Sequence, residues 1–207
     1  MDAAPLEVCA VWVETGIVPA ALRVGMIHAA ASILSPARVV VRWRVGKPDT
    51  VSGPEELRVV AIEQRGRGVG VGRILGATSS GPGSRTIWVN YANVAWAAGT
   101  TVESLASASF QERRRASIAL GRVVAHEIVH ALVPDLPHAD DGIMSDRLRD
   151  SLDRPLGLDA RTTEALLAAN QRAREAGSIQ AALALLPPAA DPPPLVVDFE
   201  LPSEGLP

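Results

Sequence analysis

The chain has 207 residues, of which 47% are hydrophobic and 21% charged, and its formal net charge is -3. This composition is typical of one globular domain, and a weak negative charge without a long Lys/Arg run excludes an electrostatic footprint for nucleic acid. A single cysteine, Cys9, excludes an internal disulfide framework, and we expect no apolar run long enough to span a membrane.

The first half of the chain has the pattern of short strands around one helix. Apolar periodicity predicts strands over residues 6–14, 38–45, 56–63 and 86–91 and a helix from Pro19 to Leu34. Cys9 falls in the first strand, where we expect it to be a small core residue. The order strand, helix, strand, strand favours a mixed sheet with helices packed on it.

The second half of the chain is mostly helical in its pattern. Ser109 followed by Glu112 is a capping-box pattern, and the lack of proline from Phe110 to about Val133 predicts one long helix that Pro134 ends. A further helix is predicted over residues 159–175. We therefore place the domain at residues 1–178 and a proline-rich C-terminal tail at residues 179–207.

One segment of the tail, PPPLVVDFELP, has its own pattern. Leu195, Val197, Phe199 and Leu201 alternate with the residues between them, which gives the segment one apolar face with a period of two. Two interpretations remain open. The segment docks as an extended strand, on a sheet edge or near a substrate groove, or it is a disordered linker.

Three of the four histidines lie in the stretch HEIVHALVPDLPHADDGIMS, which runs from His126 to Ser145. His126 and His130 are four residues apart on the predicted helix, so their imidazoles lie on one face and can share one ion. Glu127 lies beside them, rotated around the helix. In this HExxH pattern the two histidines bind zinc and the glutamate is the general base for an activated water.

A third ligand is needed because a catalytic zinc usually takes three protein ligands. His138 follows the predicted end of the helix in a short loop that can fold back under the ion. Asp140, Asp141 or Glu164 on the next helix are the alternatives. Farther along, Met144 lies in the tight-turn sequence GIMS.

The stretch HEIVHALVPDLPHADDGIMS resembles the zinc site of the metzincin peptidases, in particular their matrixin-like branch. The resemblance extends over roughly residues 6–175. It implies an α+β fold in which a mixed twisted sheet of about five strands carries a long active-site helix and a C-terminal helix. It also implies that His126, His130 and His138 are the zinc ligands, that Glu127 is the general base and that Met144 is the turn methionine.

The same resemblance implies where substrate binds, and comparison with the family pattern also shows departures. The segment GRILGAT corresponds in position to the edge strand that holds substrate, which assigns Ile74, Leu75 and Gly76 to substrate binding, and Val129 would line the pocket beside the metal. Where the family has a glycine this chain has Val133, and where the family has its third ligand this chain has Leu136. His138 therefore comes two residues later than the third ligand of the family. The loop before the edge strand contains no histidine that could form a second, structural site, so we expect one zinc.

These features predict a zinc-dependent endopeptidase that hydrolyses peptide bonds with metal-activated water and Glu127 as general base. Two alternatives remain: a catalytically inactive, zinc-containing peptide-binding module, and a gluzincin-type peptidase with an acidic third ligand. We expect a peptide or protein substrate, no nucleic-acid or membrane partner, and a monomer. The resemblance favours a secreted or periplasmic location, although the first residues lack the basic region and cleavage site of a signal peptide.

Overall fold

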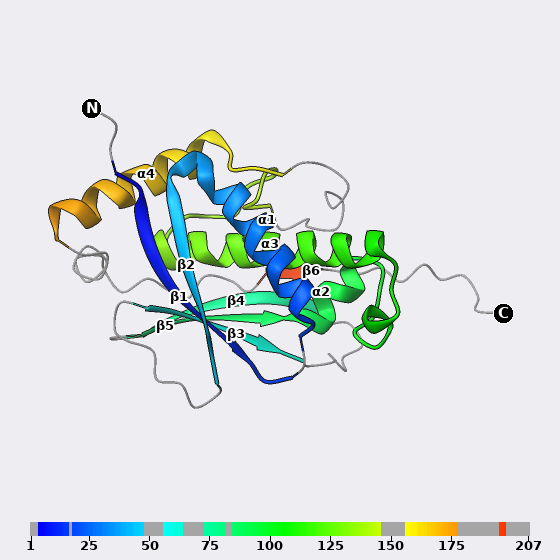
Figure 1. Ribbon diagram of the computed structural model, residues 1–207. Coiled ribbons are helices and arrows are strands. Elements are labelled where there is room, and N and C mark those ends of the chain that lie inside the picture. The colour runs from blue at the N-terminus through cyan, green and yellow to red at the C-terminus, as the bar shows by residue number, and fades with distance from the viewer. Residues whose placement is uncertain are drawn as a thin grey trace.

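The computed structural model describes residues 4–16, 18–47, 56–63, 73–81, 84–145, 156–177 and 195–197. Its order of elements is β1 (Leu6–Glu14), α1 (Ala20–Leu34), η1 (Ser35–Ala37), β2 (Val39–Gly46), β3 (Glu56–Ile62), β4 (Arg73–Gly81), β5 (Ser84–Asn90), α2 (Tyr91–Ala97), η2 (Ser104–Ala106), α3 (Phe110–Leu132), α4 (Ala160–Glu175) and β6 (Leu195–Val197). The helices lie on one side of a twisted sheet (Figure 1). This is the α+β architecture that the sequence predicts.

The sheet has the strand order β2-β1-β3-β5-β4-β6. The strands β2, β1, β3 and β5 are parallel to one another, whereas β4 runs antiparallel to β5. These five strands are the ones that the sequence predicts. The sixth strand, β6, comes from the proline-rich tail and pairs antiparallel with β4. The other tail residues lie outside the described part of the chain.

Two long helices, α1 and α3, pack together through very small residues. A Cβ atom built on Gly121 would lie 2.5 Å from Ala29 Cβ, and one built on Gly25 would lie 2.6 Å from Ser117 Cβ. Both contacts are closer than two carbon atoms approach in practice, so the helix spacing depends on the missing side chains. This contact fixes α3, which carries the HExxH pattern, against α1.

The short helix α2 is the element that the sequence pattern misses. The aromatic and β-branched run before it predicts a strand that includes Tyr91, but the strand ends at Asn90. The Asn90 side chain accepts a hydrogen bond from the Asn93 N–H, which starts the helix in the manner of an N-cap. The polar cap therefore decides the boundary, against the β-propensity of its neighbours.

The stretch Ala20–Ala37, which is α1 with η1, is long and apolar enough to cross a membrane, with a mean hydropathy of 1.2. The expectation that no run of the chain reaches such a length is therefore wrong. In the fold, α1 buries one face, formed by Leu22, Met26, Ala30, Ile33 and Leu34. This face packs in the core, and 33% of the stretch is buried.

Cys9 is exposed, which corrects the expectation that it belongs to the core. The first residues of β1 alternate, with Leu6 and Val8 buried and Glu7 and Cys9 facing outward. The continuous apolar run over the rest of β1 concealed this alternation. In the structure the thiol is on the outer face of the sheet.

Candidate metal centre

The helix α3 begins with the capping box that the sequence predicts. The Ser109 hydroxyl accepts from the Glu112 N–H at 3.3 Å, and the Glu112 carboxylate accepts from the Ser109 N–H at 2.7 Å. The helix ends at Leu132, two residues before Pro134. Its last two turns place His126 and His130 on one face, and both side chains are buried.

The loop after α3 folds back under the helix end and brings His138 to the other two histidines. The Ala139 N–H donates to the Met144 carbonyl at 3.0 Å, and Ala139 and Ser145 form an isolated β-bridge. Met144 itself is fully buried. Leu136 is also buried and packs in the core, while His138, two residues later, reaches the cluster.

The three imidazoles converge on one point. His126 Nε2 lies 3.1 Å from His130 Nε2 and 3.2 Å from His138 Nε2, and the latter two atoms are 3.2 Å apart. Nitrogen ligands of a tetrahedral zinc, at 2.0–2.1 Å from the metal, are about 3.3 Å from one another. The spacing therefore fits three ligands of a single ion.

The orientation of His126 is fixed by the loop. Its Nδ1 lies 2.9 Å from the Ile143 carbonyl oxygen, which can only accept, so Nδ1 carries the proton and donates. The Nε2 lone pair then points into the cluster, as metal binding requires. Burial lowers the pKa of His126 to about 4. Burial, with its two histidine neighbours, lowers the pKa of His130 to about 3. Both imidazoles are thus neutral near pH 7, which is their ligand form.

Glu127 lies outside the group of three ligand atoms and against strand β4. Its Oε2 accepts from the Thr78 hydroxyl at 2.7 Å, while Oε1 has no hydrogen-bond partner among the described residues. Burial raises the pKa of Glu127 to about 7, and the hydrogen bond from Thr78 acts in the opposite direction. A buried carboxylate that follows a candidate ligand, His126, in the chain and has one oxygen without a described partner can accept a proton from a water.

Gly76 leaves the space that the Glu127 carboxylate occupies. A Cβ at Gly76 would lie 2.7 Å from Glu127 Oε1 and 2.9 Å from Val123 Cγ1. Gly76 and Thr78 are two apart on β4 and so are on the same face of the strand. This face of β4 therefore forms one wall of the site.

The remaining predicted site residues have different surroundings. Leu75 and Val129 are fully buried among core residues, and the backbone of Ile74 pairs with Val196 of β6. The acidic alternatives for the third ligand are exposed, and within the described ranges they do not join the histidine group: Asp140, Asp141 and Glu164. The fourth histidine, His28, is exposed on α1.

The structure adds two groups that sequence reasoning missed, the Thr78 hydroxyl and the Ile143 carbonyl. The Ile143 contact is made by the backbone, so no side-chain pattern could indicate it. Thr78 lies on β4, but nothing in the sequence relates it to Glu127, 49 residues away. Both contacts depend on how β4 and the loop pack around α3.

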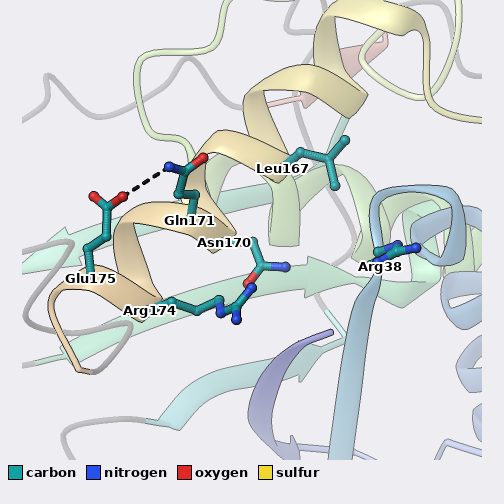
Figure 2. A pocket seen from close by; sticks show the side chains of 6 residues that line it. All are labelled: Arg38, Leu167, Asn170, Gln171, Arg174 and Glu175. Atoms are coloured by element: carbon teal, nitrogen blue, oxygen red, sulfur yellow. Dashed lines mark hydrogen bonds between the residues drawn. The ribbon is translucent and has the colours of Figure 1, made fainter. Parts of the chain in front are cut away.

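A second hollow lies on the surface along α4, lined by Arg38, Leu167, Asn170, Gln171, Arg174 and Glu175 (Figure 2). Within it Gln171 donates to Glu175 at 3.0 Å, as the dashed line shows. None of its lining residues belongs to the histidine cluster. The candidate metal centre is thus separate from this hollow.

The fold is metzincin-like, and its long helix and following loop carry three histidines that can hold a metal ion. The chain is similar in structure to archaemetzincin from Methanopyrus kandleri, with a TM-score of 0.51 and 14% sequence identity. That match covers 81% of this chain and 96% of the other. No family model matches the sequence, and no curated protein matches it. At this low identity the likeness shows the fold, and the chemistry must be argued from the side chains.

Proposed function

We propose that this protein is a zinc-dependent endopeptidase, with His126, His130 and His138 as ligands of one zinc ion. The observation that carries the proposal is the convergence of three Nε2 atoms, 3.1–3.2 Å apart, from two buried histidines and the partly buried His138. A buried glutamate, Glu127, follows His126 in the chain and is not one of this group. Three imidazole nitrogens this close together would bring lone pairs together if no cation lay between them, so the donor set suits a divalent ion.

The chemistry that zinc supplies when bound is Lewis acidity, which makes a water acidic near neutral pH and polarises a carbonyl group. Glu127 is the general base: it accepts the proton from that water and afterwards donates it to the leaving amine. Thr78 holds one carboxylate oxygen, which leaves Oε1 for the proton transfer. The Ile143 carbonyl orients His126, and the buried Met144 supports the loop that carries this contact.

A peptide substrate would bind in the extended form along β4. Backbone hydrogen bonds to Ile74 and Gly76 would supply affinity in the manner of strand addition. Gly76 contacts the Glu127 carboxylate, so a peptide along this strand would pass beside the base. Strand addition suits an endopeptidase because it recognises the backbone, which every peptide shares.

The test separates metal binding from chemistry. Glu127→Ala should keep about one zinc per chain, because Glu127 is not among the ligands, and should lose most hydrolysis of fluorescein-labelled casein. Zinc content is measured on the same samples, and Glu164→Ala, at an exposed acidic residue of α4, is the matched control. Hydrolysis by Glu127→Ala at the parent rate would refute the mechanism. Zinc binding and casein binding without cleavage by the parent chain would favour an inactive peptide-binding module.

A further inference from the structure

The tail strand β6 lies on the part of β4 that the proposed function assigns to substrate. Val197 pairs with Arg73, Val196 with Ile74 and Leu195 with Gly76, with a register shift between Ile74 and Gly76. In Figure 1 the short β6, drawn in red, lies next to β4 at the edge of the sheet. A segment of the chain's own tail therefore occupies this edge.

Gly76 is paired on both sides. Its register partner on β5 is Val89 and its partner on β6 is Leu195. Because each edge of a strand accepts one neighbour, a peptide cannot add to β4 here while β6 is in place. The edge is closed to substrate in this arrangement.

The same segment passes close to the proposed base. Gly76 contacts the Glu127 carboxylate, and paired strands are about 4.8 Å apart, so Leu195 lies one strand spacing from a residue that touches Glu127. The pairing is therefore at the part of the edge that lies next to the proposed base.

The pairing is short and can be reversed. β6 has three residues, and the three prolines before it in the sequence have no N–H with which to extend the ladder. Residues 178–194 separate β6 from the end of the described α4 segment and can span roughly 60 Å when extended. A segment tethered at this length has an effective concentration on the order of millimolar at the edge.

We propose that Leu195–Val197 is an intramolecular inhibitor: it adds to β4 as a strand in the place of substrate, and a peptide must displace it to be cleaved. This inference rests on the proposed function. A millimolar competitor with an affinity of about 0.1 mM would raise the KM for substrate roughly tenfold and leave kcat unchanged.

The experiment compares two double variants of the 207-residue, zinc-loaded chain. Val196→Pro/Val197→Pro removes two of the three backbone N–H groups of β6 and fixes φ at these two residues away from the strand value. Val196→Thr/Val197→Thr keeps both amides and the β-branched shape and is the matched control. We measure KM and kcat on fluorescein-labelled casein, and amide hydrogen exchange in the peptide that covers 73–81.

The proline variant should show faster exchange in β4 and a KM about tenfold lower at the parent kcat, and the threonine variant should match the parent. Unchanged exchange in the proline variant would mean that β6 does not pair with β4 in solution. Faster exchange with an unchanged KM would mean that this edge is not the route of substrate. Either result overturns the proposal.

Failure of the proposed function gives a different outcome. If no variant cleaves casein, the binding of labelled casein is measured by fluorescence anisotropy. The tail variants used for this measurement also carry Glu127→Ala. Tighter binding by the proline variant would then keep the tail as a competitor for peptide on a protein that does not cut. Equal binding by all variants would overturn the inhibitor role as well.

Discussion

Gly76→Ala tests whether β4 sets the position of the proposed base. The added methyl carbon would lie 2.7 Å from Glu127 Oε1 and 2.9 Å from Val123 Cγ1, whereas such contacts normally exceed about 3.4 Å. The end of the Glu127 side chain is the part that can move, so we expect it to shift by about 0.7 Å. A misplacement on the order of 1 Å can cost about 100-fold in rate, which predicts a 10- to 100-fold lower kcat, as an order of magnitude.

None of the three histidines is among the nearest neighbours of the new methyl group, so the zinc content should stay at the parent value. Gly157→Ala is the matched control because a Cβ there meets nothing within 4 Å. Casein hydrolysis, zinc content and melting temperature are measured for both variants. A Gly76→Ala protein that cleaves within about twofold of the parent rate would show that the Glu127 position is not set by this contact.

Three further outcomes are expected. His138→Ala should lower zinc affinity strongly, measured by chelator competition, since it removes one of three converging ligands; undiminished occupancy would assign the third position to another residue. Thr78→Val removes a hydrogen bond that lowers the pKa of Glu127, so this pKa should rise. The acidic limb of the plot of kcat/KM against pH should then move to higher pH by about one unit. A limb that stays in place or moves to lower pH would contradict this expectation. Gly25→Ala should destabilise the fold by roughly 1–3 kcal/mol because its methyl overlaps Ser117, and adding Ser117→Gly should recover most of that loss in thermal unfolding; no recovery would place the strain elsewhere.

The elements and the two helix-borne histidines could be predicted from local sequence, because periodicity and caps act over a few residues. β1, α1, α3 and α4 begin and end within a residue of the expected positions, and the box at Ser109 is formed as predicted. HExxH spacing on a helix is enough to place His126 and His130 together.

Contacts between distant segments could not be predicted in the same way. The period of two in the tail indicates a strand but not its partner, so the pairing of β6 with β4 does not follow from the sequence. The bond from Thr78 to Glu127 depends on where β4 crosses α3, and the Ile143 contact on the return of a loop. The sequence predicts a core position for Cys9, which is exposed, because an apolar run conceals which of its residues face outward.

The division of the proposed ligands between two kinds of segment has a consequence for how a metal ion enters and leaves. His126 and His130 lie on a helix whose residues from 116 to 132 are nearly all buried, so they open only with the core. His138 is carried by a loop, and its side chain is only partly buried. The bonds described for this loop are few: Ala139 donates to Met144 within it, and the Ile143 carbonyl contacts His126 of the helix. Opening of that loop, at a lower free energy than unfolding of α3, should therefore set the rate at which zinc exchanges, with two ligands retained in place while the third releases the ion.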